Sequence, residues 1–287
     1  MKKFLALALS SVLALSLLAG CGSSNTPAAS GSSTSGSAST GETVTLKVGA
    51  SITPHAEILA QCKPILAEQG IDLVIKEYTD YVQPNTALEE GSLDANYFQH
   101  INYLNWFNGE YNTHLVSAAS VHYEPFGIYA GKVSAIADLK DGDVIAIPND
   151  GSNETRALLL LQQEGLITLK EGITAASNAT VLDIESYNVN VTIQEMEAAQ
   201  LAQALPGIAM AVINGNYALQ GGLNAGTDAL AIEAADGDAA QEYGNILAVK
   251  EGHENDPAIL ALIDVLHSDT IRDYINNTYS GAVVPTF

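Results

Sequence analysis

The chain has 287 residues, with 33 acidic against 11 basic side chains and a formal net charge of −22 at pH 7. Hydrophobic residues make up 47% and charged residues 15%, which is typical of a globular protein and excludes a disordered acidic chain. The negative charge argues against partners such as nucleic acid or anionic lipid, because both require a basic surface. The two cysteines exclude a disulfide-rich scaffold and any metal module held by several cysteines.

The N-terminus carries the pattern of a bacterial lipoprotein signal. A short basic start precedes an apolar run, Phe4 to Leu18, that is too short for a membrane-spanning helix. Residues 18–21 read Leu-Ala-Gly-Cys and resemble the lipobox, at which a diacylglycerol is attached to the cysteine and the chain is cut before it. We therefore expect a signal peptide over residues 1–20 and lipidation of Cys21. An ordinary secretion signal with an incidental cysteine is the alternative.

The segment after Cys21 is predicted to be a linker. Residues 22–41 contain no large apolar and no charged side chain, so they cannot pack into a core. Residues 21–43 are thus expected to tether a folded domain to the outer face of the cell membrane, with the lipid as its attachment. The other cysteine, Cys62, lies in a helical pattern and is expected to be a buried structural residue.

The rest of the chain alternates between strand-like and helical patterns. Such alternation predicts an α/β fold with mainly parallel sheets and helices on both faces. Two runs of it indicate two lobes, the first over 44–122 together with about 230–287 and the second over about 123–229. Strands are expected at 44–50, 71–78, 95–98, 114–120, 125–129, 144–147, 180–184, 189–193, 208–213 and 245–249, and helices at 54–70, 84–90, 100–108, 153–164, 195–205 and 257–279.

Sequence signatures of common enzymes and cofactor sites are absent. We find no glycine-rich nucleotide loop, Walker A sequence, H-E-x-x-H, G-x-S-x-G or C-x-x-C. The 33 carboxylates permit many acid–base pairs and specify none. We therefore expect neither enzymatic activity nor a cofactor. A zinc or manganese site formed by His100, His114, His122 and a carboxylate remains an alternative, although the histidines lack the spacing of a helical metal site.

Arg156 is the first candidate for ligand binding. It lies in the first turn of a predicted helix, where a cation opposes the helix macrodipole by roughly 0.3–1 kcal/mol. A bound anion would reverse this penalty, because the free N–H groups of the helix and a guanidinium can hold one carboxylate together. A structural ion pair with one of the many acids is the alternative, and the sequence alone favours neither.

Aromatic and amide side chains are the other candidates. Residues 78–129 hold most of the aromatic side chains, some of which must be core, but tyrosine also suits pocket walls. Amides follow predicted strands, where they can bind an ammonium or a carboxylate without net charge, or can be ordinary turn residues. An arginine and an aromatic wall on opposite sides of a cleft would fit a small amphiphilic acid such as an amino acid. These amides are Asn85, Asn96, Gln99, Asn149, Asn214 and Asn216.

Taken in order, several segments resemble the methionine-binding lipoproteins of bacterial ABC importers, the NlpA lipoprotein family. The resemblance covers about residues 44–285. It implies a two-lobed, type II-like periplasmic-binding-protein fold with a ligand cleft between the lobes. The segments are Thr53–Leu59, Tyr78–Asn85, Leu93–His100, Ile147–Asp150, Arg156–Leu158 and Asn214–Ala218.

The resemblance also implies a function and roles for individual residues. A monomer would capture methionine, the L form with the D form as a further ligand, and deliver it to a membrane permease driven by a cytoplasmic ATPase. A methionine-containing dipeptide, another amino acid or a small anion is the alternative cargo, and a surface hydrolase or a structural lipoprotein is the alternative class. Arg156 would bind the α-carboxylate and Asn214 the head group. The thioether pocket would be walled by Tyr81, Phe98, His100 and Tyr103, with Asn85, Asn149 and Asn153 as further candidates.

Overall fold

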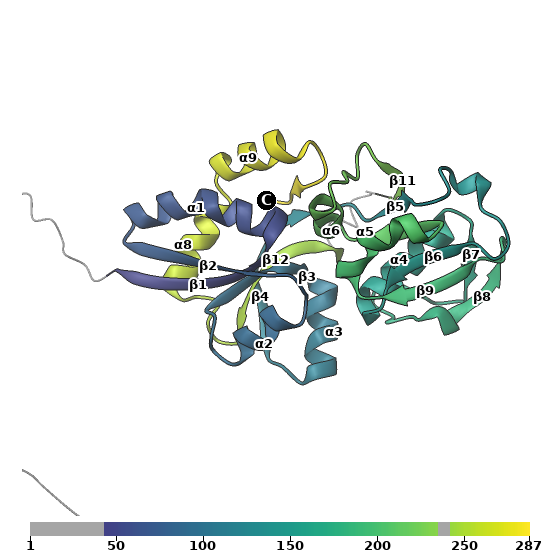
Figure 1. The fold of residues 1–287 in the computed structure, drawn as a ribbon. Helices are drawn as coiled ribbons and strands as arrows, with labels where there is room; N and C mark the ends of the chain where they lie inside the picture. The colour runs from purple at the N-terminus through teal and green to yellow at the C-terminus, as the bar shows by residue number, and fades with distance from the viewer. Residues whose placement is uncertain (1–42, 235–241) are drawn as a thin grey trace, which may run out of the picture. The chain divides into compact units, whose positions relative to one another are not determined.

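The computed structural model describes residues 43–234 and 242–287. The predicted signal peptide, Cys21 and nearly all of the linker lie outside these residues. The described chain is built from two main β-sheets with helices packed on them (Figure 1). Each sheet with its helices forms one lobe. None of the described helices has the combination of length and apolarity needed to cross a membrane.

The first sheet has the strand order β13-β4-β12-β3-β1-β2. β1 pairs in parallel with β2 and with β3, whereas β12 runs antiparallel between β3 and β4. The chain therefore leaves this sheet after β4 and returns to its centre as β12. The strands are β1 (Val44–Ser51), β2 (Ile71–Tyr78), β3 (Ala95–His100), β4 (Leu115–Tyr123), β12 (Gly244–Lys250) and β13 (Val284–Pro285).

Helices cover both faces of the first sheet because its central strands are apolar on both sides. In β12, Leu247 and Val249 belong to the core that also contains residues of α1, α8 and α9. The alternate residues Ile246 and Ala248 pack with Leu88 of α2 and with residues of α3, as the two-residue period of a strand requires. The helices are α1 (Glu57–Glu68), preceded by a π-helical turn (Ile52–Ala56), α2 (Gln83–Glu89), α3 (Ile101–Tyr111), α8 (Pro257–Leu266) and α9 (Asp269–Tyr279).

The second sheet has the order β11-β5-β10-β6-β9, and β7 and β8 form a separate pair. Ile145 and Ile147 of β6 pack with α4 in one cluster, while the intervening Ala146 packs with α5 and α6 in another. β11 begins at Ala229 and joins this sheet. The elements are β5 (Gly127–Ala130), β6 (Val144–Pro148), α4 (Gly151–Gln163), β7 (Ile167–Leu169), β8 (Ile184–Tyr187), β9 (Thr192–Met196), α5 (Leu201–Ala204), β10 (Met210–Ile213), α6 (Gly215–Gln220) and β11 (Ala229–Ile232).

Three predicted elements differ from the structure. The helix expected at 195–205 is only a short 3-10 turn followed by α5, because β9 continues to Met196. The helix expected at 257–279 is two helices, since Ser268 caps α9 by accepting a hydrogen bond from the backbone N–H of Ile271. The strand expected at 180–184 is a 3-10 turn, Val181–Asp183, followed by β8.

The two lobes touch where α3 meets the start of α4. Gly151, the first residue of α4, lies against the indole of Trp106 on α3. A Cβ on Gly151 would stand 2.6 Å from Trp106 Nε1 and 2.8 Å from Cδ1, which is too close for any stable contact. A side chain at position 151 would therefore have to displace the indole of Trp106.

The core of the first lobe can be tested on α8. Leu262 is fully buried in the core, whereas Leu260 on the same helix is 43% exposed. We expect Leu262→Ala to lower the free energy of unfolding by about 2–5 kcal/mol, because it leaves a cavity in the core. Leu260→Ala should change it by less than about 0.5 kcal/mol. Urea unfolding of both variants measures the difference, and equal midpoints would contradict the packing of α8 described above.

The contact between the lobes can be tested by fluorescence, since Trp106 is the one tryptophan of the chain. Gly151→Ala should displace the indole and shift its emission to longer wavelength as the ring gains exposure. Gly109→Ala, on the same helix as Trp106 but with open space around the added methyl group, is the matched control and should leave the emission unchanged. Identical spectra for the two variants would show that Trp106 does not rest on Gly151 in solution.

Candidate ligand-binding pocket

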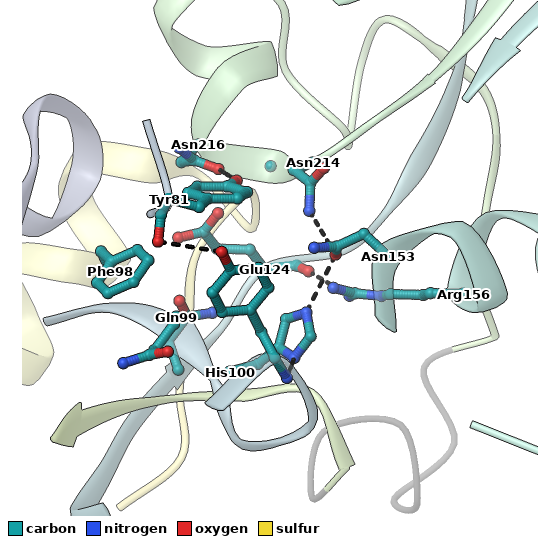
Figure 2. Close-up of a pocket in the computed structure, with 12 residues that line it drawn as sticks. Tyr81, Phe98, Gln99, His100, Glu124, Asn153, Arg156, Asn214 and Asn216 are labelled. Atoms are coloured by element: carbon teal, nitrogen blue, oxygen red, sulfur yellow. Dashed lines mark hydrogen bonds between the residues drawn. The ribbon is translucent and has the colours of Figure 1, made fainter. Parts of the chain in front are cut away.

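A pocket lies between the two lobes (Figure 2), with about 320 Å³ of empty space, part of which is open to solvent. Seven of the candidates from the sequence meet there. The first lobe contributes four of them, Tyr81, Phe98, His100 and Tyr103, and the second contributes Asn153, Arg156 and Asn214. Two more of the amides that follow predicted strands, Gln99 and Asn216, also line the pocket. Glu124, Gly215 and Asn245, which the sequence did not single out, complete the lining.

The apolar wall consists of three aromatic rings from the first lobe. The ring centroids of Tyr81 and Phe98 are 5.8 Å apart, those of Tyr81 and Tyr103 5.5 Å, and those of Phe98 and Tyr103 6.0 Å. The Tyr103 hydroxyl donates to the backbone oxygen of Tyr81 at 3.0 Å, and the Tyr81 hydroxyl donates to Asn216 Oδ1. These bonds satisfy both hydroxyls, so the rings present a fixed apolar surface to the pocket.

His100 links the two lobes by a hydrogen bond, and its ring is held in one tautomer and one charge state. It precedes α3, and its Nδ1 accepts a hydrogen bond from the backbone N–H of Tyr103 at 3.0 Å. Its Nε2 therefore carries the hydrogen and donates to Asn153 Oδ1 at 3.1 Å. Burial, together with the positive charge of Arg156, lowers the pKa of His100 to about 3, so the ring is neutral at physiological pH. Asn153 Oδ1 also accepts from Asn214 Nδ2 at 2.8 Å.

Arg156 is engaged in a structural ion pair, one of the two roles that the sequence left open. Its Nε donates to Glu233 Oε2 at 2.8 Å, and its Nη2 donates to Glu233 Oε1 and, at 3.0 Å, to the backbone oxygen of Glu124. The guanidinium also lies 4.1 Å from the ring centroid of Tyr243 and 4.7 Å from that of Phe126. Its Nη1 makes no hydrogen bond to a described residue, so one edge of Arg156 remains for a ligand.

Two amide groups in the pocket have unused hydrogen-bonding capacity. Asn214 Oδ1 and Asn216 Nδ2 are both buried and find no partner among the described residues. The first is an acceptor and the second a donor, and each buried unpaired group costs about 1–3 kcal/mol. A ligand with a donor and an acceptor at one end would satisfy both.

Glu124 places a buried carboxyl group in the pocket that the sequence analysis missed. It follows β4, is 5% exposed, and its Oε1 accepts from His122 Nε2 at 2.7 Å. Burial raises its pKa, and this is opposed by the nearby His55 and Arg156 side chains and by a hydrogen bond from the backbone of Asn216. Within the described residues, no lysine or arginine side chain forms an ion pair with its carboxylate. A buried carboxylate of this kind favours a cation in the pocket, and nothing in the sequence distinguishes Glu124 from the other acids.

The histidines do not form the metal site considered from the sequence. His100 bonds to Asn153, and the side chain of His114 is largely exposed beside Glu89. A different trio, His55, His122 and Glu124, brings its ligand atoms within 4.8 Å of one another. Both rings are already used in hydrogen bonds: His55 Nε2 lies 2.9 Å from Asn245 Oδ1, and both nitrogens of His122 are bonded. The ring nitrogens nearest Glu124 are therefore engaged by protein partners, whereas His55 Nδ1 is buried and finds no partner among the described residues.

Two further candidates lie outside the pocket. The side chain of Asn85 bonds to Asn96 and Gln99 in a buried amide cluster behind the pocket. Asn149 lines a larger neighbouring cavity, which has about 1010 Å³ of empty space, part of it open to solvent, and shares Tyr81 and Tyr103 with the pocket. That cavity is also lined by four carboxylates, Asp80, Glu110, Asp150 and Glu197, and by the aromatic rings of Trp106, Tyr111 and Tyr217.

Comparison with known proteins places the chain in a family. The sequence model of the NlpA lipoprotein family matches residues 46–287. The methionine-binding lipoprotein MetQ of Bacillus subtilis is 40% identical over 242 residues, covering 83% of this chain and 86% of MetQ. A crystal structure of a putative lipoprotein from Ruminococcus gnavus has 54% identity and a TM-score of 0.83, covering 85% of this chain and 99% of that one.

The chain is also similar to a solved structure that contains a bound ligand. The structure of a nutrient-binding protein from Burkholderia cenocepacia bound to methionine has 38% identity and a TM-score of 0.80. The match covers 84% of this chain and all of that one, at 100%. The sequence resemblance and the two-lobed α/β fold are thereby confirmed, and the chain belongs to the NlpA lipoprotein family.

Proposed function

We propose that this protein captures methionine in the pocket between its lobes, as the substrate-binding component of an ABC importer. The observation that carries the proposal is that one small pocket combines unpaired head-group partners of both polarities with an aromatic wall. The similarity to MetQ and to a methionine-bound protein supports the choice of ligand.

The polar end of the pocket suits the zwitterionic head of an α-amino acid. Arg156 Nη1 and Asn216 Nδ2 are available donors for a carboxylate, the first of them charged. Glu124 and Asn214 Oδ1 are available acceptors for an ammonium group. Two donors are thus available for the carboxylate of the ligand, and two acceptors for its ammonium group. A small anion alone would leave Glu124 without a cation, which argues against that alternative.

The aromatic wall suits the side chain of methionine. Tyr81, Phe98 and Tyr103 offer apolar ring faces and edges whose own polar groups are already bonded. A thioether gains roughly 0.3–1.5 kcal/mol from such contacts. A charged or strongly polar side chain would find no free partner on this wall among the described residues, so the wall favours methionine over polar amino acids.

Transport would follow from binding rather than from catalysis. The ligand enters between open lobes, and closure is favoured only by contacts that are better in the closed state. The protein is a monomer, attached to the outer face of the cell membrane by a lipid on Cys21. It then delivers its cargo to a permease driven by an ATPase. The family resemblance supports these partners, the anchor and the absence of enzymatic activity.

A methionine-containing dipeptide is the second candidate cargo. The observation in its favour is the larger cavity beside the pocket, which shares Tyr81 and Tyr103 with it. A second residue attached to methionine could extend into that space. A comparison of free methionine with its dipeptides therefore belongs in the first experiment.

The ligand can be identified by thermal melting of protein that begins after Cys21 and has been unfolded and refolded to remove carried-over ligand. The twenty amino acids and several methionine dipeptides would be tested separately. A ligand at 1,000 times its dissociation constant adds about 4 kcal/mol, or roughly an 8–16 °C rise in melting temperature for a domain of this size. We expect the largest rise with methionine. No rise with any amino acid would exclude methionine as the cargo.

The role of Glu124 can be tested with Glu124→Gln, which removes the charge and keeps the shape. We expect methionine to bind about 10–100-fold more weakly, because hydrogen bonds to charged groups contribute about 1.5–3 kcal/mol. Glu154→Gln is the matched control, because Glu154 is 3% exposed and bonds the backbone of Val181 away from the pocket. Calorimetry measures both affinities. Equal affinities in the two variants would show that Glu124 does not bind the ammonium group.

A further inference from the structure

Behind Glu124 a chain of hydrogen bonds leads away from the pocket into the core of the first lobe. His122 Nε2 lies 2.7 Å from Glu124 Oε1, and His122 Nδ1 is hydrogen-bonded to the hydroxyl of Tyr97. Tyr97 and His122 are fully buried, and neither lines the pocket. The hydrogen bonds of these two residues therefore reach the pocket through Glu124.

The chain of bonds has two possible hydrogen arrangements. In the first, Tyr97 donates to His122 Nδ1, and His122 Nε2–H donates to an ionised Glu124. In the second, His122 carries its hydrogen on Nδ1 and donates it to Tyr97, while a protonated Glu124 donates to Nε2. Burial lowers the pKa of His122 to about 3, so the ring has a single hydrogen and must adopt one arrangement or the other.

The hydroxyl of Tyr97 favours the first arrangement. Among the described residues its one hydrogen-bond partner is His122. In the second arrangement the Tyr97 O–H hydrogen would be left unpaired in a fully buried position, at a cost of about 1–3 kcal/mol. The first arrangement leaves no hydrogen unpaired. Tyr97 thus fixes the tautomer of His122, and His122 in turn fixes Glu124 as an acceptor.

The other groups that face Glu124 do not replace a ligand cation. His55, from the turn before α1, has its Nε2 3.4 Å from Glu124 Oε1, but burial lowers its pKa to about 4 and the ring is neutral. Arg156, on α4, is paired with Glu233. The backbone amide of Asn216, on α6, favours the ionised carboxylate of Glu124, but it brings no net charge.

We propose that Tyr97 and His122 are positioning residues that hold Glu124 as an acceptor-only carboxylate and thereby make the pocket select ligands that carry an ammonium group. The inference rests on the proposed function and extends it to the substrate class. Free amino acids are accepted, whereas analogues without the amine, and dipeptides in which the nitrogen of methionine is acylated, are disfavoured.

The test uses Tyr97→Phe, which removes only the hydroxyl. Its matched control is Tyr129→Phe, because Tyr129 is equally buried and its hydroxyl has no partner among the described residues. Calorimetry gives the affinities for L-methionine and for 4-(methylthio)butanoate, which lacks the amine. In Tyr97→Phe we expect methionine to bind about fivefold more weakly, as for loss of one hydrogen bond. The affinity for the analogue should not fall, so the ratio of the two affinities shrinks.

A second readout needs no ligand. Burial already raises the pKa of Glu124, and Tyr97→Phe should raise it further by permitting the protonated arrangement. Carboxyl-labelled NMR should therefore find protonation of Glu124 beginning at higher pH in Tyr97→Phe than in the wild type or in Tyr129→Phe. Methionine affinity should likewise begin to fall at a higher pH as the solution is acidified.

His122 supplies an independent pair of variants if Tyr97→Phe does not fold. His122→Gln retains a side-chain N–H that can reach Glu124 and should preserve the selectivity for the amine, whereas His122→Leu should lose it. An unchanged affinity ratio and unchanged Glu124 titration in Tyr97→Phe would overturn the proposal. If the wild type bound neither ligand, the proposed function would fail, and the ligand-free titration would still decide whether Tyr97 and His122 control Glu124.

Discussion

The pocket depends on one buried carboxylate that the described protein leaves without a cation. Glu124 lies at the point where the chain passes from the first lobe to the second, and its closest side-chain partners are two neutral histidines. Burying an anion is unfavourable unless a cation or several hydrogen bonds compensate for it. The structure supplies the hydrogen bonds from inside the first lobe and leaves the cation to a ligand, which links the stability of the closed pocket to the ligand's charge.

Arg156 differs from Glu124, because its charge is largely compensated by other groups of the protein. Glu233 and Glu124 belong to the two segments that connect the lobes, and Arg156 contacts both, through the Glu233 carboxylate and the Glu124 backbone oxygen. Stacking on Tyr243 and Phe126 adds to its fixed position. Removal of Arg156 would leave the buried Glu233 with hydrogen bonds from Tyr123 and Phe126 but without a cation, typically at a cost of about 3–5 kcal/mol. The free Nη1 edge of Arg156 is thus held rigidly, which reduces the entropy lost when a carboxylate binds.

The sequence was sufficient to predict the alternating strands and helices and the two-lobed α/β fold, because these follow from local periodicity. The aromatic residues of the pocket wall were named from the family resemblance, and their contact with a ligand stays a prediction. Glu124 and Glu233 could not be recognised among 33 acids. The importance of Glu124 comes from its burial, and that of Glu233 from its pair with Arg156, 77 residues away in the chain. Asn85 had the residue type of a ligand-binding amide, yet its hydrogen bonds go to Asn96 and Gln99. Only tertiary structure separates an amide that faces a pocket from one that supports it.

The residues that wall the pocket also hold the lobes together. His100 bonds to Asn153, and Tyr81 bonds to Asn216, in each case across the lobes. Tyr81 also stacks with Tyr217, whose hydroxyl donates to the backbone oxygen of Thr79 at 3.1 Å. A ligand that touches these side chains can bind tightly only where both lobes are in place, so its binding energy favours the closed state over the open one. Selectivity for the ligand and closure of the lobes therefore rest on the same few contacts, and a ligand that leaves Glu124 unpaired would weaken both.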